Sequence, residues 1–412
     1  MKNQNRKIPK IRFNNSKIDW QQIKFKNLLN SEEGIRRGPF GSALKKELFV
    51  QNSEYVVYEQ QNAIYDHFNT RYRISEEKYH ELKKFILLPG DFIMSGAGTI
   101  GKISLVPEGI ENGVFNQALI RLKVNKNTDK EFFLQWMRSS KMQNKLTKAN
   151  PASAMVNLVP MSEVKEWDVI VPSPEEQSAI GSLFRTLDEL LSSYKDNLAN
   201  YQSLKATMLS KMFPKAGQTV PEIRLDGFEG EWEEKKLGSL GSVAMNKRIF
   251  KDETSDYGDI PFYKIGTFGG TADSFITKEK FKEYKEKYPY PEIGDILISA
   301  SGSIGRTVVY NGEDAYYQDS NIVWLKHDQQ LDNSYLKQYY GIIKWSGIEG
   351  TTIKRLYNKN ILETNIFLPP SVAEQRAIGT YFSNLDNLIN SYQEKISQLE
   401  TLKKKLLQDM FI

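Results

Sequence analysis

An internal repeat constrains this 412-residue chain more than any other feature. Residues 173–213 read SPEEQSAIGSLFRTLDELLSSYKDNLANYQSLKATMLSKMF. Residues 371–411 read SVAEQRAIGTYFSNLDNLINSYQEKISQLETLKKKLLQDMF. The two stretches align without a gap at an offset of 198, and 17 of their 41 positions are identical. Such self-similarity predicts a fold built from two related halves.

Both copies have the periodicity of long helices. Apolar residues recur at steps of 4 and 3, the a/d seam of a coiled coil. Pro172 and Pro370 stand just upstream, and Ser173 and Ser371 each precede a glutamate by three residues, which predicts a capping box. About 40 residues at 1.5 Å each make rods of roughly 60 Å. The predicted seam residues are Ile180, Phe184, Leu187, Leu191, Tyr194 and Leu198, then Ile378, Phe382, Leu385, Ile389, Tyr392 and Ile396.

The order of the repeat is cyclic. The segment IPKIRF, followed by Trp20, matches VPEIRL, followed by Trp232, with the same spacing to the tryptophan. The second copy of this element follows the first helix, whereas the first copy lies at the N-terminus and its matching helix lies at the C-terminus. The sequence therefore predicts a pseudo-twofold cyclic repeat whose ends lie close together. An ordinary helical hairpin is the alternative, and the roughly 150 residues between the helices argue against it.

The repeat sets the expected domain boundaries. We expect an N-terminal segment (1–18) that completes the distal repeat, a first globular domain (19–171), a central helix (172–216), a second globular domain (217–369) and a distal helix (370–412). The globular parts mix short β-rich runs such as EYVVYEQ and NIVWLKH with fewer helices. The expected fold class is α+β, with two mixed α/β domains joined by two long helices that pack on each other.

A glycine-rich stretch raises the question of nucleotide binding. SGAGTIGK (95–102) matches the dinucleotide pattern G-x-G-x-x-G and nearly matches a P-loop. Its twin SASGSIGR (299–306) lacks the first glycine of both patterns, and a β-like run rather than a helix follows each. We therefore expect a strand, a glycine turn and a second strand, preceded in both domains by Gly-Asp.

Composition and motifs exclude several other functions. The chain has no cysteine, signal peptide or apolar run of membrane-spanning length, so we expect a cytoplasmic protein without membrane association. His67, His80 and His327 lack metal-site spacing. The nearest matches to methyltransferase and nuclease motifs are Asn150-Pro151-Ala152-Ser153 and Glu283-Tyr284-Lys285, and both are incomplete or expected by chance. We therefore expect no catalysis and no metal in this chain.

Positive charge is concentrated in the globular domains. The two helices hold nine cations and ten carboxylates, a net charge of −1. Because the whole chain carries +5, the residues outside the helices carry +6. Arginine and lysine set among glycines suit phosphate and guanine contacts. The alternative for any one cluster is an ordinary solvated surface. The candidate DNA-binding residues are Arg36, Arg37, Lys45, Lys46, Arg71 and Arg73 in the first domain, then Lys247, Arg248 and Lys251 in the second.

Taken together, these features resemble the specificity (S) subunit of type I restriction–modification systems. The resemblance covers the whole chain. It is carried by the paired helix starts SPEEQSAIGSLF and SVAEQRAIGTYF after VIVP and FLPP, by GPFGSALKK, by Gly-Asp and the G-[ST]-I-G turn in both domains, and by the cyclic IP-x-IR…W element.

The resemblance implies a non-catalytic DNA-recognition subunit. Each globular domain would read one half of an asymmetric, bipartite double-stranded DNA site, and an antiparallel coiled coil would set the unread spacer. Two methylation (M) subunits binding S-adenosylmethionine would dock on the chain, and restriction (R) subunits using ATP and Mg would join through them, while the chain binds no cofactor itself. For docking we favour outward coiled-coil positions and the helix starts at Glu176-Gln177 and Glu374-Gln375, which could equally be caps.

Two rival functions remain open. One is a coiled-coil interaction or scaffold protein without sequence-specific DNA binding. The other is a self-sufficient enzyme such as a nuclease, which the missing catalytic motifs disfavour.

Overall fold

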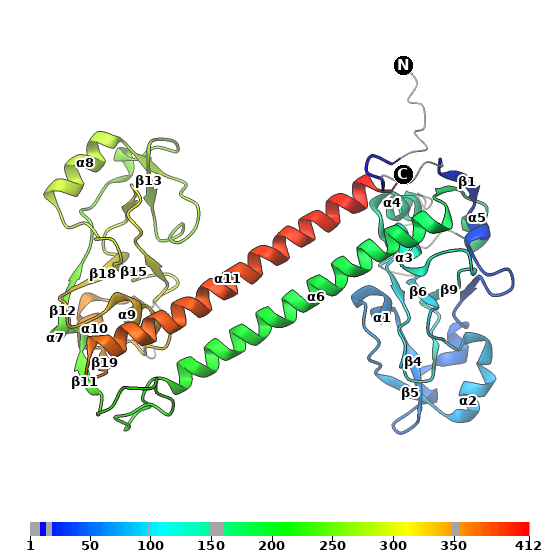
Figure 1. The fold of residues 1–412 in the computed structure, drawn as a ribbon, viewed down its shortest axis with the longest axis horizontal. Helices are drawn as coiled ribbons and strands as arrows, with labels where there is room; N and C mark the ends of the chain where they lie inside the picture. The colour runs from blue at the N-terminus through cyan, green and yellow to red at the C-terminus, as the bar shows by residue number, and fades with distance from the viewer. Residues whose placement is uncertain (1–8, 14–18, 97–98, 149–159, 348–354, 412) are drawn as a thin grey trace, which may run out of the picture. The chain divides into compact units, whose positions relative to one another are not determined.

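A computed structural model describes residues 9–13, 19–96, 99–148, 160–347 and 355–411 of the chain. The chain folds as two compact units (Figure 1). Unit 1 comprises Met1–Lys195 with Glu394–Ile412, and unit 2 comprises Asp196–Gln393. Packing thus divides each long helix between the units, whereas the boundaries expected from the sequence follow the ends of the repeat. Ile8 of the IPKIRF element and the Asn150-Pro151-Ala152-Ser153 string lie outside the described residues.

The two repeated stretches are helices of equal length. Helix α6 spans Pro174–Lys211 and helix α11 spans Val372–Asp409, 38 residues each. The hydroxyls of Ser173 and Ser371 accept the amide N–H of the residue three positions on, at 3.4 and 3.2 Å, so both serines are N-caps as predicted. The glutamates of the predicted capping boxes do not complete them, because each carboxylate pairs with an arginine from elsewhere in the chain.

The two helices pack antiparallel in each unit. In unit 1 the ring of Phe184 lies 5.8 Å from that of Phe411, and Lys403 pairs with Asp188. In unit 2 the ring of Tyr201 lies 5.4 Å from that of Tyr392, and Lys205 pairs with Asp386. The predicted seam is the inward face of both helices, with its residues buried (Ile180, Phe184, Leu187, Leu191, Ile378, Phe382, Leu385 and Ile389) or half-buried (Tyr194, Leu198, Tyr392 and Ile396).

Among the described residues, domain 1 contains two four-stranded sheets. One has the order β2-β9-β6-β7 and is antiparallel, and the other has the order β3-β5-β4-β8, with β4 and β8 parallel. The strands are β2 (Ile35–Arg37), β3 (Phe49–Val50), β4 (Tyr55–Tyr58), β5 (Tyr72–Ile74), β6 (Phe92–Ser95), β7 (Ile103–Leu105), β8 (Gly113–Phe115) and β9 (Leu119–Leu122). The helices are η1 (Phe25–Leu28), η2 (Gly41–Leu44), η3 (Lys46–Leu48), α1 (Gln60–Tyr65), α2 (Glu76–Glu81), η4 (Lys83–Phe85), α3 (Lys130–Arg138), α4 (Ser140–Lys148) and α5 (Met161–Lys165).

Domain 2 repeats the first of these sheets and changes the second. Its four-stranded sheet has the order β12-β18-β15-β16, so β2 and β12 are equivalent edge strands, while its second sheet has the three-stranded order β14-β13-β17. The strands are β12 (Gly241–Ala244), β13 (Ile260–Tyr263), β14 (Phe275–Ile276), β15 (Ile296–Ser299), β16 (Thr307–Val309), β17 (Tyr316–Tyr317) and β18 (Ile322–His327). The helices are α7 (Leu237–Leu240), η5 (Lys251–Glu253), α8 (Lys278–Lys287), α9 (Asn333–Tyr340) and α10 (Asn358–Glu363).

A two-stranded ribbon joins each domain to its long helix. In unit 1, β1 (Gln21–Lys24) pairs antiparallel with β10 (Asp168–Val171), just before α6. In unit 2, β11 (Glu233–Lys236) pairs antiparallel with β19 (Asn365–Leu368), just before α11. None of the helices in the described part of the chain combines the length and apolar content that crossing a membrane needs.

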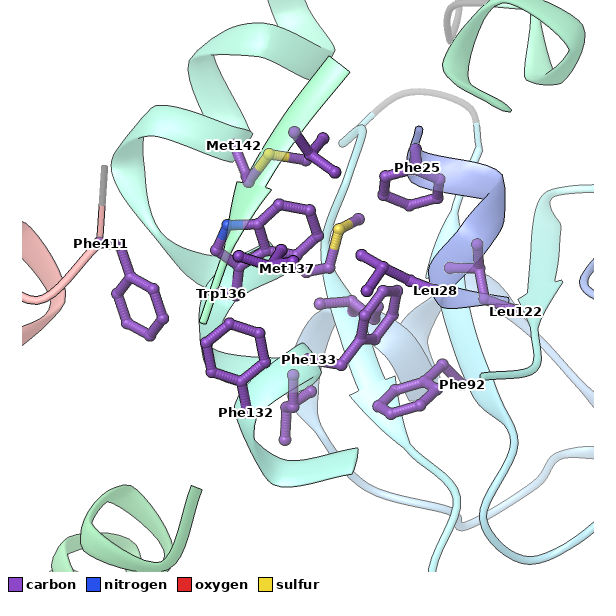
Figure 2. Close-up of a cluster of buried hydrophobic side chains, with 14 of the residues drawn as sticks. Phe25, Leu28, Phe92, Leu122, Phe132, Phe133, Trp136, Met137, Met142 and Phe411 are labelled. Carbon is purple, nitrogen blue, oxygen red and sulfur yellow. The ribbon is translucent and has the colours of Figure 1, made fainter. Parts of the chain in front are cut away.

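The long helices share their cores with the domains. In unit 1, Phe132 of α3 lies 5.8 Å from Phe411 and 6.3 Å from Trp136 between ring centres (Figure 2). In unit 2, Phe213, the repeat partner of Phe411, lies 5.6 Å from Tyr335 of α9. Each domain is therefore packed onto the coiled coil through a buried aromatic core rather than attached by a flexible linker.

Two glycines allow this close packing. A Cβ added at Gly181 of α6 would lie 2.9 Å from the amide nitrogen of Phe132, and one at Gly379 of α11 would lie 2.6 Å from the Cβ of Ser334. Real Cβ atoms do not approach so closely, so each long helix requires glycine where the first turn of α3 or α9 crosses it.

The cyclic element fixes the start of each long helix. Arg12 donates from Nε and Nη2 to both carboxylate oxygens of Glu176 at 2.8 Å, and Arg224 binds Glu374 in the same way at 2.8 Å. The amide N–H of Ile11 donates to the carbonyl of Asp409, and that of Ile223 donates to the carbonyl of Lys211. Each IR segment thus follows the end of one long helix and clamps the start of the other. These contacts confirm the cyclic order and the closeness of the described ends.

Candidate DNA-binding surfaces

The two glycine stretches form equivalent β-hairpin turns. The Ser95 hydroxyl accepts the amide N–H of Lys102 at 3.0 Å, and the Ser299 hydroxyl accepts that of Arg306 at 2.9 Å. Gly101 and Gly305 have φ values of +77° and +81°, which glycine adopts at no steric cost. Strand β7 or β16 follows each turn, as predicted, rather than the helix N-terminus that would receive a phosphate in a P-loop. Gly98 lies outside the described residues.

The aspartates of the Gly-Asp motif brace these hairpins from the other end. Asp91 accepts the amide N–H of Leu88 at 3.1 Å, and Asp295 accepts that of Glu292 at 2.8 Å. Burial raises the pKa of both carboxyls. Their shared role is structural: each closes the turn that precedes β6 or β15.

In domain 1, the sequence-predicted cations divide between two sheets. Arg36 and Arg37 lie on edge strand β2, with Arg37 exposed and Arg36 half-buried opposite Arg121 of β9. The Nε of Arg36 is buried without a hydrogen-bond partner. Exposed Lys45 and Lys46 follow on the loop that runs through η2 and η3 into β3. This loop begins where β2 ends, so these four cations form one basic stretch along the edge of the domain.

Arg71 and Arg73 belong to a different environment. Arg71 binds both carboxylate oxygens of Glu59 at 3.0 and 3.1 Å, and Arg73 binds Glu111 at 2.8 Å and the Ser53 carbonyl at 2.7 Å. Both residues sit at β5 of the second sheet. Because their charges are already paired within the domain, they are weaker candidates for phosphate contacts than the β2 cations.

In domain 2, the predicted cations share one loop after β12. Lys247, Arg248 and Lys251 are exposed, and the Arg248 guanidinium lies 3.6 Å from a carboxylate oxygen of Asp319. The neighbouring Asn246 is 2% exposed, and neither its amide nitrogen nor its amide oxygen has a hydrogen-bond partner.

Sequence reasoning missed a second arginine beside this loop. Arg355 donates to the hydroxyl and the carbonyl of Ser320, the residue after Asp319, and its guanidinium lies 5.7 Å from the ring centre of exposed Tyr357. Ser320 has a φ of +51°, which is uncommon for a residue with a side chain. One tight turn therefore positions both Arg248 and Arg355. The only signal in the sequence was that Arg355 lies two residues before Tyr357. Nothing in the sequence linked Arg355 to the loop of Arg248, about 100 positions earlier.

Nothing in the described ranges is arranged for metal-dependent catalysis. They contain no group of three or more His, Asp or Glu residues that could hold a metal ion. His80 lies on a helix surface 3.6 Å from Glu76, His67 stacks on Tyr65, and His327 contacts Asn333. Glu283 of the nuclease-like string pairs with Lys287 at 3.1 Å on the surface of α8, an ordinary helical i,i+4 pair.

The helix starts that the sequence offers for partner docking make internal contacts instead. Glu176 and Glu374 are 5% and 1% exposed and bind the clamp arginines. The Gln177 amide oxygen accepts the backbone N–H of Asp129, and the Gln375 amide oxygen accepts that of Asp332. These side chains hold the domains on the helices and do not offer a free docking surface.

Two small grooves lie at equivalent places beside these helix starts. One, of about 250 Å³ in unit 1, is bordered by β1, Val171 and Pro172. The other, of about 370 Å³ in unit 2, is bordered by β11, Pro369 and Pro370. The repeat thus gives each unit a matching concave feature where ribbon, helix start and domain meet.

The chain thus combines two divergent globular domains with a repeated pair of long helices. The model of the type I restriction modification DNA specificity domain matches residues 17–200 and 229–401, so the chain belongs to that family.

Individual relatives agree with this family. A putative type I restriction enzyme specificity subunit of Haemophilus influenzae is 53% identical over 160 residues, which are 39% of this chain and 41% of that protein. A putative specificity subunit of Methanocaldococcus jannaschii is 23% identical over 368 residues, covering 81% of this chain and 80% of the relative. The fold matches the crystal structure of the type I restriction–modification S subunit from M. genitalium with a TM-score of 0.63 and 18% identity, covering 98% of this chain and 99% of that one.

Proposed function

We propose that this chain is the DNA sequence-specificity subunit of a type I restriction–modification complex. Domain 1 reads one half of an asymmetric, bipartite double-stranded DNA site, and domain 2 reads the other half. Helices α6 and α11 set the number of unread base pairs between the halves. The chain itself carries out no chemistry and binds no cofactor.

One observation carries the proposal: the two units repeat their helices, clamps and glycine hairpins but differ in the loops that follow β2 and β12. The helix seam, the Arg–Glu clamps and the glycine hairpins recur in both units. By contrast, the loops after β2 and β12 differ in length and in cation placement, and the second sheets differ in strand number. A repeated frame suits two identical partners, and divergent loops suit two different half-sites.

The expected partners follow from the repeat. Two methylation subunits, carrying S-adenosylmethionine, dock on the matched surfaces of the two units, and the paired grooves beside the helix starts are candidate contacts. Restriction subunits, using ATP and Mg, join the complex through them. All of these cofactors belong to the partner subunits.

Co-expression with the methylation subunit from the same locus tests the proposal. N6-methyladenine mapped across the host DNA should reveal two short specific blocks separated by a fixed gap. Replacing residues 19–171 with the corresponding domain of a relative should change one block and leave the other block and the gap unchanged. A stable complex that methylates nothing, or methylates ungapped sites, would favour the coiled-coil scaffold function instead.

A further inference from the structure

Two exposed phenylalanines occupy equivalent positions in the otherwise divergent domains. Phe40 is 90% exposed and Phe250 is 59% exposed. Each follows the edge strand of its four-stranded sheet, β2 or β12, and each immediately precedes a short 3₁₀ helix, η2 or η5. A single exposed phenylalanine is unremarkable on a protein surface. An exposed phenylalanine in the corresponding loop of both domains, although the loops differ in length, calls for a shared explanation.

Local hydrogen bonds order the main chain at both phenylalanines. The Phe40 carbonyl accepts the amide N–H of Ala43 at 2.8 Å, and a Cβ added at Gly41 would lie 2.6 Å from the side-chain oxygen of Gln117. Phe250 donates its amide N–H to the Glu253 carboxylate at 2.7 Å, and its carbonyl accepts the amide N–H of Glu253 at 3.0 Å. These contacts define the main chain of each turn, and both phenylalanine side chains are exposed on it.

A cation lies beside the Phe250 ring, and cations flank Phe40 in the sequence. The Arg248 guanidinium lies 5.6 Å from the ring centre of Phe250, and Lys251 follows directly in sequence. In domain 1, Arg37 ends strand β2 three residues before Phe40, and Lys45 follows five residues after it. An apolar ring among cations cannot be a site for an apolar protein partner without burying charge. It suits a ligand with negative charges outside and flat apolar faces within, which is the chemistry of a DNA duplex.

We propose that Phe40 and Phe250 are wedge residues, each inserting its ring at a base step of the half-site read by its own domain. This inference rests on the proposed DNA-recognition function and names residues for it. A ring as exposed as that of Phe40 loses most of its contact with water only when it is covered on both faces, which insertion between bases achieves and contact with one thymine methyl does not. The flanking cations would bind the phosphates on either side of the opened step.

The test uses the chain assembled with its methylation subunits and a duplex carrying the bipartite site found by methylation mapping. 2-Aminopurine, whose fluorescence rises when a base loses its stacking, replaces each adenine of the two half-sites in turn, except the methylated adenines, which the methylation subunits themselves would flip out of the duplex. The wild-type complex should brighten at least one probe in each half-site. Phe40→Ala should abolish the signal in one half-site only, and Phe250→Ala in the other. Each should weaken specific binding by about 10-fold, the scale of one lost base contact.

Matched controls separate a wedge from a general effect of surface change. Tyr65→Ala in domain 1 and Ile293→Ala in domain 2 remove side chains that are 71% and 77% exposed away from these turns. Both should leave fluorescence and affinity at wild-type values. Phe40→Trp, which keeps a flat apolar ring, should retain the signal in its half-site.

Two outcomes overturn the wedge. One is a wild-type complex that binds the bipartite site without brightening any probe. The other is a pair of alanine variants that behave like the Tyr65 and Ile293 controls. Failure of the wild-type complex to bind a bipartite site at all would instead contradict the proposed function, so the two failures are distinguishable.

Discussion

At the scale of single residues, the buried arginine–glutamate clamps are the contacts most sensitive to change. The Glu374 side chain is 2% exposed, and Arg224 supplies both of its charged hydrogen bonds. Arg224→Ala should destabilise the protein by about 3–5 kcal/mol, because it leaves a buried carboxylate unpaired. Lys211→Ala breaks an exposed pair with Glu222 and should cost under about 1 kcal/mol. Urea unfolding of the two variants measures the difference, and equal losses would show that the clamp is dispensable.

Acid should loosen the helix pair of unit 2 through one carboxylate. Burial alone would raise the pKa of Asp386, but hydrogen bonds and charge from Lys205 and Lys337 outweigh it and hold the pKa below its ordinary value. A lowered pKa gives stability that is present above the ordinary value of about 3.9 and is lost as pH falls through the folded value. Asp386→Asn should therefore lower the unfolding midpoint at pH 7 and flatten its fall below about pH 4. Parallel curves for variant and wild type would contradict this assignment.

At the scale of elements, the glycines at which α3 and α9 cross the long helices determine how closely each domain packs on its helix. Gly181→Val would force its side chain into the first turn of α3, whose Phe132 amide nitrogen is 2.9 Å from the new Cβ. Overpacking of this kind typically costs 1–3 kcal/mol. Ser182→Val, one position along at an exposed site of the same helix, should cost only its small helix propensity. Thermal unfolding compares the two, and similar shifts would mean that the crossing tolerates a side chain.

Elements with a local signal were predictable, and contacts between distant segments were not. The apolar steps in Ile180–Leu198 and the serine caps at residues 173 and 371 lie within one helix turn or a few, so the sequence alone indicated them. The pattern Ser-x-x-Glu also fits a capping box, yet Glu176 binds Arg12, 164 residues away. Local spacing cannot show whether such a glutamate completes a capping box or binds an arginine from a distant segment.

The candidate DNA surface shows the same limit. Charge and glycine context located Arg248, because both are visible within a few residues. Arg355 joins it only through the Asp319–Ser320 turn, which brings together segments about 100 residues apart in sequence. Arg71 and Arg73 looked equally basic in sequence, but folding gives each a carboxylate partner. A cation's availability depends on such partners, and a list of charges does not contain them.

At the scale of the whole molecule, the cyclic repeat predicts tolerance of circular permutation. Eleven residues, 212–222, connect Lys211 to Ile223, whereas joining Ile412 to Met1 would place thirteen residues between Asp409 and Ile11. New ends opened at Gly217, in an exposed turn with a φ of +82°, would then reproduce the same clamps in permuted order. We expect this permutant to fold with a melting temperature within a few degrees of wild type and to methylate the same gapped site. A permutant opened within α6, at Tyr194, is the matched control and should unfold at lower temperature.

The matched Asp–Lys pairs between the two long helices also have a consequence for how such a chain can evolve. Asp188 with Lys403, and Asp386 with Lys205, are the same pair of residue types 198 positions apart, so each half of one helix accepts the corresponding half of the other. A genetic exchange with a crossover inside the helix-coding stretch would therefore deliver a new recognition domain with its docking contacts already correct. The repeated helices would therefore allow one globular domain to be replaced in a single event while the other is kept unchanged.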